Sequence, residues 1–325
     1  MISDQLVKNF RERFPVVVEN EPMSKHTSLR IGGPARLYFV AEQVDDLTNI
    51  LKAAQADGIP FYVFGGGSNM LVSDQGFDGL IVQIAFRAIQ VRRVTISAFA
   101  GAVTSMVAKQ AGEAGLAGLE WATGVPGTIG GAVYGNSGCF GGEVKDNLVS
   151  VDVLTLPDLK RVALPKAECQ FGYRDSRFKR EPHIILMATF GLKAGDFIDI
   201  RKRMDDIVKK KKAGQPYDHP SAGCMFKNFV YQDEAEIEIL KRQIKDVPAD
   251  MLARKSISAG WLVDQVGMRG EKIGEVQVSE KHGNFLVNLG SARAQDVLML
   301  TSKVKMKVRD ELGVMLEDEV QLVGF

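Results

Sequence analysis

The sequence predicts an α+β protein made of two small lobes and a further C-terminal lobe. The chain has 325 residues, which exceeds the usual size of a single hydrophobic core. Its first part contains a helical pattern, a short apolar strand and a glycine-rich loop in succession, which is typical of an α/β lobe. The strands that follow lack the spacing of βαβ units, which favours an antiparallel or mixed sheet. We therefore expect lobes at residues 1–90, 91–196 and 197–325.

The pattern of apolar residues identifies the elements of the first lobe. Val44, Leu47, Ile50, Leu51 and Ala54 recur at helical spacing, and a glycine at position 58 ends that helix. The runs "FYVF" (61–64) and "GLIVQI" (79–84) predict two buried strands. The glycine-rich loop lies between these strands.

The two later lobes are predicted in the same way. The second lobe opens with the segment 94–102, a helix is expected at 103–114, and strands are expected at 148–156 and 183–192. A basic helix begins near residue 197, and its run from Lys209 to Lys212 is interpreted as a solvated face, with a minor role in binding a ligand phosphate left open. A long helix follows Ser291, which is the predicted N-cap, and ends at Gly313. Residues 319–325 form a terminal strand.

The balance of charges excludes several classes of partner. Lys and Arg number 41 against 40 Asp and Glu, so the net charge is +1. This argues against an electrostatic binder of nucleic acid or of an anionic membrane. No apolar stretch reaches the ~20 residues of a spanning helix, and the N-terminus lacks the apolar core of a signal peptide. We expect a cytoplasmic protein without membrane insertion.

Two glycine-rich loops are the first indication of a ligand. "FGGGSNMLVSD" (64–74) follows a predicted strand, and "TGVPGTIGGAVYGNSG" (123–138) lies in the next lobe. Glycine lets a ligand approach the backbone, and successive N–H groups can bind an anion. The first loop has neither a Walker A nor a GxGxxG pattern, and a glycine-rich turn without a ligand remains an alternative for it. Together the two loops predict an extended ligand with a diphosphate.

The three cysteines, Cys139, Cys169 and Cys224, do not form a recognisable framework. They are odd in number and widely spaced, without a CxxC pair or a histidine at ligand spacing. We therefore expect no disulfide framework and no metal site. Cys224, in "SAGCMFKNF", is either a small buried side chain or a chemical group aimed at a substrate.

Six motifs occur in an order that resembles the UDP-N-acetylenolpyruvoylglucosamine reductase family. They are "GGGSN", "GLEWATGVPGTIGGAVYGNSG", "FGYRDSRFK", "SAGCMFKNF", "AGWLVDQVGMRGEKIG" and "LEDEVQLVG", and the resemblance covers about residue 23 to 325. It implies a two-lobe FAD-binding domain of the vanillyl-alcohol-oxidase-like (PCMH) type and a C-terminal lobe for the UDP-sugar. Only about 20 residues separate "YRDSRFK" from the basic helix, so the chain resembles the shorter type, which lacks an extra tyrosine loop.

The resemblance also implies an activity and its cofactors. NADPH reduces non-covalently bound FAD and leaves, and UDP-N-acetylglucosamine enolpyruvate then accepts the hydride. Arg174 and Glu319 polarise the substrate carboxylate, and the residue at position 224 protonates the carbon that bears it. To donate a hydrogen bond, Glu319 must be protonated. Glu317 is a second candidate for this role, since it lies two positions away.

By the same resemblance, further residues are expected at the two binding sites. The substrate residues are Tyr173, Arg174, Lys212, Asn228 and His282. The cofactor residues are Gly65, Gly66, Gly67, Ser68, Asn69, Gly124, Pro126, Gly127, Gly130, Gly131, Asn136 and Gly138.

The chain departs from the commonest family pattern at the proton donor. It has Cys224 where serine is usual, and Phe229 where proline is usual. A thiol, with an ordinary pKa of about 8.5, is a much stronger acid than a serine hydroxyl, so Cys224 is predicted to act as the acid.

Two other functions are compatible with the glycine loops alone. One is a flavin oxidase on the same fold, and the other is a non-catalytic nucleotide-binding module. Neither needs an acid, a guanidinium and a carboxylate together, so the three motifs favour the reductase.

Overall fold

The structure is a computed structural model that describes residues 2–325, and it divides into two compact units. Unit 1 contains the N-terminal residues through Glu21 together with Ala35–Gly67 and Phe77–Ala213, and unit 2 contains Pro22–Pro34, Ser68–Gly76 and Gly214–Phe325. The basic helix therefore belongs with unit 1, which differs from the boundary expected at residue 197. Each unit has its own hydrophobic core.

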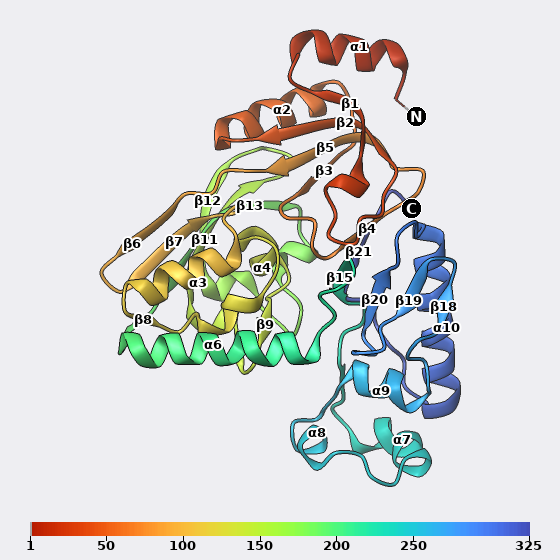
Figure 1. The fold of residues 1–325 in the computed structure, drawn as a ribbon. Helices are drawn as coiled ribbons and strands as arrows, with labels where there is room; N and C mark the ends of the chain where they lie inside the picture. The colour runs from red at the N-terminus through yellow and green to blue at the C-terminus, as the bar shows by residue number, and fades with distance from the viewer. Residues whose placement is uncertain (1) are drawn as a thin grey trace. The chain divides into compact units, whose positions relative to one another are not determined.

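The first sheet of unit 1 is formed by strands from the range expected for the first lobe, 1–90, although Pro22–Pro34 and Ser68–Gly76 of that range belong to unit 2. Its strand order is β1-β2-β5-β3, and β5 runs parallel to both β2 and β3. Helix α2 connects β2 to β3 and buries Leu47, Ile50, Leu51 and Ala54, as their spacing predicted. Figure 1 shows α2 along this sheet. The elements are α1 (Asp4–Arg13), β1 (Val18–Pro22), β2 (Pro34–Ala41), α2 (Val44–Ala56), β3 (Phe61–Phe64) and β5 (Phe77–Ile84).

The second sheet of unit 1 is antiparallel, as expected from the absence of βαβ spacing. Its order is β12-β11-β13-β7-β6. The two sheets fall on either side of the predicted lobe boundary near residue 90, except that β6 begins at Ile89. The strands are β6 (Ile89–Arg92), β7 (Thr95–Phe99), β11 (Leu148–Thr155), β12 (Arg161–Pro165) and β13 (His183–Gly191).

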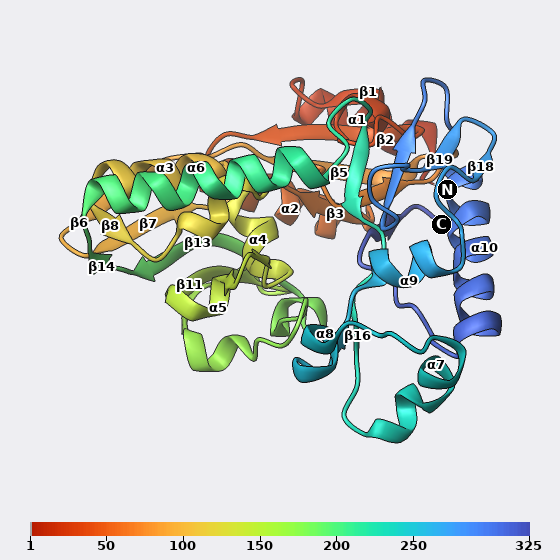
Figure 2. The same cartoon turned by 60° about the horizontal axis from the view of Figure 1, so that its bottom comes forward.

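Four helices and several short strands surround the second sheet and carry the second glycine-rich loop. The helices are α3 (Thr104–Glu113), α4 (Ile129–Tyr134), α5 (Val144–Asn147) and α6 (Phe197–Gly214), with short strands β8 (Leu116–Ala117), β9 (Gly138–Cys139), β10 (Gly142–Glu143) and β14 (Lys193–Ala194). Figure 2 shows α6 alongside α3. A Cβ at Gly112 of α3 would lie 3.0 Å from Met204 Sδ of α6, so glycine permits this close packing.

Unit 2 is an antiparallel sheet covered by a long helix. The sheet order is β15-β20-β19-β18, and Figure 1 shows α10 beside β18 and β19. A separate pair joins β4 to the terminal strand β21 in parallel. The elements are β4 (Met70–Val72), β15 (Ser221–Cys224), β16 (Phe229–Val230), α7 (Glu238–Gln243), α8 (Ala249–Ala253), β17 (Ser256–Ile257), α9 (Ala259–Gln265), β18 (Lys272–Ile273), β19 (Val276–Val278), β20 (Phe285–Asn288), α10 (Ala294–Leu312) and β21 (Gln321–Val323).

The start of α10 differs from its prediction, whereas its end does not. Gly313 ends the helix with a φ of 69°, the left-handed conformation for which glycine is suited. The N-cap is Arg293, so the prediction of Ser291 is wrong. The N–H groups of Ala294 and Gln295 donate to the carboxylate of Asp74, at 2.8 and 3.1 Å. A side chain 220 residues away in sequence therefore caps the helix, which no local pattern could reveal.

Within residues 2–325, no helix combines the length and the apolar content needed to cross a membrane.

The cap on α10 predicts a loss of stability on substitution of Asp74. Asp74→Ala removes two acceptors and a negative charge from the helix N-terminus, so the free energy of unfolding should fall by about 1 to 2 kcal/mol. Asp74→Asn should retain much of it, because its amide oxygen still accepts. Urea denaturation measures the free energy of unfolding of both variants. Asp206→Ala, on the exposed face of α6, is the control, and its free energy of unfolding should lie within about 0.5 kcal/mol of the parent.

Candidate active site

The two predicted glycine loops contact each other within unit 1. A side chain at Gly65 would collide with Thr128 Oγ1, and a Cβ at Gly66 would lie 3.1 Å from the Cα of Gly127. Gly67 has a φ of 61°, a conformation that costs glycine little. Two segments about 60 residues apart in sequence thus meet closely, Gly65 against the Thr128 side chain and Gly66 against the Gly127 backbone, and a larger residue at either glycine would displace its neighbour.

Some backbone donors of the second loop are already engaged. The N–H of Gly130 donates to the Ala100 carbonyl and that of Ile129 to the Ala102 carbonyl, both at 2.9 Å. These bonds hold the start of α4 against the segment after β7. Gly130 therefore supports the loop through its backbone, while Gly131 has open space around its Cα. The expected contact of these glycines with a cofactor stays a prediction.

Three buried polar atoms on this loop have no hydrogen-bond partner among residues 2–325. They are Trp121 Nε1, Thr123 Oγ1 and Thr128 Oγ1. An unsatisfied buried polar group costs about 1–3 kcal/mol, so such a cluster indicates a ligand that supplies the partners. The isoalloxazine carbonyls, ribityl hydroxyls and phosphates of FAD offer suitable partners, and these residues fit FAD. Sequence reasoning missed all three, although each is a polar side chain within the quoted loop motif.

The lysine that reaches the loop is not the predicted one. Lys212 is exposed, whereas Lys211 is 7% exposed and its ammonium donates to the carbonyl of Gly124. A Cβ at Gly124 would lie 2.5 Å from Lys211 Cδ, so glycine makes room for the lysine stem. The basic run is a solvated face as expected except at this position. The contact of Lys212 with substrate stays a prediction.

Asn136 is a fully buried connection between the loop and its surroundings. Its Nδ2 donates to Glu143 Oε2 and to the Gly172 carbonyl, each at 2.8 Å, and its Oδ1 accepts the N–H of Lys145 at 3.0 Å. Both amide protons are therefore used by the protein. Asn136 was predicted at the cofactor site, and its side chain here organises the loop.

Arg174 projects from a tight turn that contacts the same loop. Gly172 and Asp175 exchange backbone hydrogen bonds of 3.0 and 3.3 Å around Tyr173 and Arg174. Arg174 has a φ of 51°, which for a residue other than glycine costs on the order of 1–3 kcal/mol. Its Nη2 donates to the Gly138 carbonyl at 2.9 Å, and its guanidinium carbon lies 5.5 Å from the centre of the Tyr173 ring. The guanidinium is thus oriented along the glycine loop.

Two of the three cysteines are structural thiols. Burial raises the pKa of Cys169 to about 11 and also raises the pKa of Cys139, although Lys211 and Arg174 oppose the second shift. Cys139 donates to the Trp121 carbonyl at 3.0 Å. No disulfide joins any of the three within the part of the chain described.

Cys224 lies at a bulge in unit 2. Strand β15 pairs with β20 through Ser221 and Cys224, and the register shifts between them, where Gly223 has a φ of 80°. The next residues are held by Asn284, which is 3% exposed. Its Oδ1 accepts the N–H of Phe226 at 2.9 Å, and its Nδ2 donates to the carbonyl of the same residue at 2.8 Å. Cys224 is half-buried, so it is not a core residue.

A short ladder places Glu319 beside the Cys224 segment. The N–H of Glu319 donates to the Met225 carbonyl at 2.7 Å, and the N–H of Lys227 donates to the Glu317 carbonyl at 2.9 Å. Glu317 is exposed and forms an ion pair with Lys227, whereas Glu319 is half-buried. Burial therefore distinguishes the two glutamates and favours Glu319 over Glu317 as the candidate for the carboxyl group that faces the substrate.

The end of the first glycine loop supports the same residue within unit 2. Asn69 Nδ2 donates to the Glu319 carbonyl at 3.1 Å, and the Asn69 carbonyl accepts the N–H of Gln321 at 3.0 Å. Ser68 is half-buried beside it. Asn69 thus fixes the backbone at Glu319, and its expected contact with the cofactor stays a prediction.

Two other predicted residues converge on the start of α9. Asn228 Oδ1 accepts the N–H of Ala259 at 3.2 Å, and the ring of His282 packs against Gly260, where a Cβ would lie 2.8 Å from Cε1. His282 Nδ1 accepts the N–H of Asn284 at 3.2 Å. Burial lowers the pKa of His282, so the ring is neutral at pH 7.

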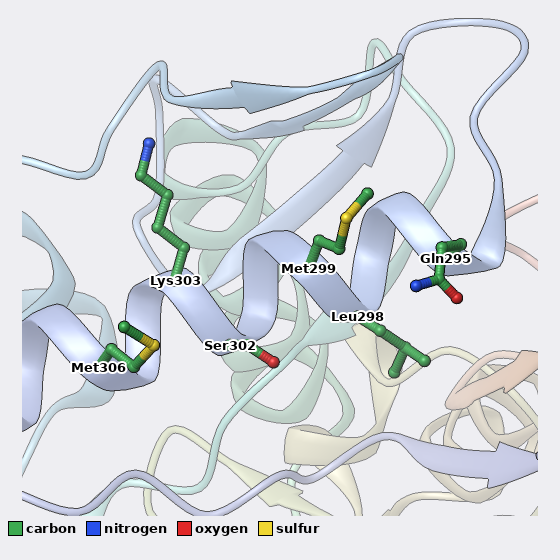
Figure 3. A pocket seen from close by; sticks show the side chains of 6 residues that line it. All are labelled: Gln295, Leu298, Met299, Ser302, Lys303 and Met306. Carbon is green, nitrogen blue, oxygen red and sulfur yellow. The ribbon is translucent and has the colours of Figure 1, made fainter.

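The hollows on the outer faces of the two long helices lack the chemistry of a catalytic site. One, of about 340 Å³, is lined by Gln295, Leu298, Met299, Ser302, Lys303 and Met306 along α10 (Figure 3). Its lysine forms an ion pair with Glu271 at 2.6 Å. The other lies on the charged face of α6 near Phe197.

The chain is similar to known families and proteins over both of its units. Residues 215–323 match the family described as the UDP-N-acetylenolpyruvoylglucosamine reductase C-terminal domain, and residues 35–162 match the family described as an FAD-binding domain. The UDP-N-acetylenolpyruvoylglucosamine reductase of Caldanaerobacter subterraneus subsp. tengcongensis is 36% identical over 306 residues, covering 94% of this chain and 93% of that protein. The enzyme of the same name from Agathobacter rectalis is 36% identical, with 99% of both chains covered.

A solved structure is similar over nearly the whole chain. It is the crystal structure of the UDP-N-acetylenolpyruvylglucosamine reductase of Thermus caldophilus, with a TM-score of 0.73 and 33% identity. The match covers 94% of this chain and 98% of that one.

The unsatisfied hydroxyl of Thr128 predicts a selective effect on FAD. Thr128→Val removes a group without a protein partner, so the stability of the apoprotein should not fall, while the Kd for FAD should rise about tenfold with one hydrogen bond lost. Titration of the apoprotein followed by flavin fluorescence measures this. Thr48→Val, on α2 of the same unit, should leave the Kd unchanged; an equal Kd for Thr128→Val would contradict the assignment.

The lowered pKa of His282 predicts a pH-dependent loss of stability. His282 takes up a proton near pH 6.5 in the unfolded chain but only at lower pH in the folded chain. Its contribution to the free energy of unfolding is therefore complete above pH 6.5 and is lost as the pH falls towards the pKa of the folded state. His282→Asn, which keeps an acceptor for the Asn284 N–H, should lose less stability than the parent between pH 7.5 and 5.5. Urea midpoints at both pH values test the difference.

Proposed function

Since this chain belongs to the UDP-N-acetylenolpyruvoylglucosamine reductase family, we propose that it reduces UDP-N-acetylglucosamine enolpyruvate to UDP-N-acetylmuramate, a peptidoglycan precursor, with NADPH as electron donor. One hydride and one proton add across the enolpyruvyl double bond, and NADPH becomes NADP⁺. The family membership and the FAD-binding domain make the protein an FAD-dependent oxidoreductase, which sets aside the non-catalytic module. The predicted α+β, PCMH-type fold is confirmed with it.

FAD would be held by unit 1. Trp121, Thr123 and Thr128 would supply hydrogen bonds from their unsatisfied atoms, and the glycines of the two loops, which have no side chains, would let the ligand approach the backbone. When bound, FAD takes up a hydride from NADPH and supplies it to the methylene carbon of the enolpyruvyl group.

Arg174 would bind the substrate carboxylate. A guanidinium forms charge-assisted hydrogen bonds with a carboxylate and stabilises the negative charge that develops there after hydride addition. Its orientation along the glycine loop, fixed by the bond to the Gly138 carbonyl, supports this role. Tyr173, which is 40% exposed beside it, would contact the substrate.

The observation that carries the proposal is the ladder between Met225–Lys227 and Glu317–Glu319. It places a half-buried carboxyl group next to the segment that carries the half-buried thiol of Cys224. Glu319, in its protonated form, would donate a hydrogen bond to the developing enolate. The S–H of Cys224 would give its proton to the carbon that bears the carboxylate, and the thiolate would regain a proton from solvent.

Asn228, His282 and Lys212 complete the proposed substrate contacts. Asn228 and His282 both pack at the start of α9, where a neutral imidazole can donate through Nε2 to an uncharged group of the sugar or the uracil. Lys212, exposed at the end of the basic helix, would pair with a phosphate.

Substitution of Cys224 tests the proton donor. Cys224→Ala should slow reoxidation of the reduced flavin by the enolpyruvyl nucleotide by about 10²- to 10⁴-fold, because the general acid is lost, while reduction by NADPH remains unchanged. Cys224→Ser should retain most of the activity, since the hydroxyl can still transfer a proton. Anaerobic stopped-flow measurement of flavin absorbance separates the two half-reactions.

The same experiment has two results that would reject the proposal. Normal reoxidation in Cys224→Ala would exclude this residue as the acid. Reoxidation by oxygen that outpaces reoxidation by the enolpyruvyl nucleotide in the parent protein would instead indicate the oxidase alternative. Cys169→Ala serves as a matched control, because that thiol is fully buried and its pKa is raised to about 11.

A further inference from the structure

The turn that carries Arg174 has an unfavourable sequence for its shape. Tyr173 and Arg174 are the two central residues between the paired Gly172 and Asp175, and Arg174 is the one with positive φ. Turns with positive φ at the second central position favour glycine or asparagine there. An arginine therefore needs contacts elsewhere in the structure to stay in this conformation.

Lys179 provides such a contact to the backbone of Arg174 itself. Its Nζ donates to the Arg174 carbonyl oxygen at 2.7 Å, from the 3₁₀ turn Arg177–Lys179 that follows. The same ammonium lies 5.7 Å from the centre of the Tyr134 ring, so it also has a cation–π contact with α4. This charge-assisted bond fixes the peptide group that follows Arg174.

Other contacts fix the remaining sides of the turn. Asn136 donates to the Gly172 carbonyl at 2.8 Å, and Ser176, which is fully buried, donates to the Tyr134 carbonyl at 2.7 Å. These bonds secure the entry and the exit of the turn. The contact from Lys179 is made at the residue with positive φ, where the backbone has the strongest tendency to relax.

We propose that Lys179 is a positioning residue for Arg174. By bonding the Arg174 carbonyl it holds the left-handed backbone conformation, so that the guanidinium faces the substrate carboxylate without rearrangement. Lys179 itself touches neither substrate nor cofactor in this role. The inference goes beyond the proposed function and rests on it, because it requires that Arg174 bind the substrate carboxylate.

A double-mutant cycle with Arg174 tests the inference. Lys179→Met should slow reoxidation of the flavin by the enolpyruvyl nucleotide about tenfold to hundredfold, the loss typical of a misplaced catalytic group, and leave reduction by NADPH unchanged. In an Arg174→Ala background, Lys179→Met should cause no further loss, since the residue that it positions is gone. Lys179→Arg keeps a cationic donor and should recover part of the rate. Lys166→Met, exposed on the same unit, should have no effect.

The outcomes separate the inference from the proposed function. Normal reoxidation in Arg174→Ala would overturn the proposed role of Arg174. Impaired Arg174→Ala together with a normal Lys179→Met would overturn only the positioning role. A loss from Lys179→Met that persists in the Arg174→Ala background, or that affects both half-reactions equally, would also overturn the positioning role. If Lys179→Met does not fold, Lys179→Arg decides: a folded Lys179→Arg that reoxidises as slowly as Arg174→Ala would overturn the positioning role.

Discussion

The close backbone contact between the two glycine loops is the constraint on which the rest of unit 1 depends. Gly65 and Gly66 meet Gly127 and Thr128 at distances that leave no room for a Cβ without displacement. The contact exists because one sheet ends in the first loop and the other supports the second loop through the N–H groups of Ile129 and Gly130. Buried polar atoms of Trp121, Thr123 and Thr128 are then left for a ligand.

The Arg174 turn is attached to that loop at several points. Asn136 bonds its entry, and the Gly138 carbonyl accepts from the guanidinium. The loop that would hold the cofactor therefore also orients the residue that would bind the substrate. Part of the favourable energy of these bonds offsets the strain of a non-glycine residue at positive φ.

In unit 2, backbone hydrogen bonds hold the Glu317–Glu319 segment beside the segment that follows Cys224, although the two come from distant parts of the chain. Asn284 clamps the segment after Cys224, and Asn69 fixes the backbone at Glu319. Both amides are bonded to backbone groups, so they set the register and leave the chemistry to other side chains. A shift of one residue would exchange Glu319 for a neighbour that faces the other side.

The sequence alone indicated helices α2, α3, α6 and α10, strands β3, β5, β11, β13 and β21, the two glycine loops, the family and the candidate Cys224, because apolar periodicity and local motifs encode these features. Tertiary structure decided which lysine of the basic run turns inward, which of Glu317 and Glu319 is half-buried, and that Asp74 rather than Ser291 serves the start of α10. It also revealed the unsatisfied groups at Trp121, Thr123 and Thr128. The outcomes for the lysine, the glutamates and the start of α10 each depend on a contact between residues far apart in sequence, which leaves no local pattern to read, and whether a buried polar atom finds a partner depends on the packing of the whole unit around it.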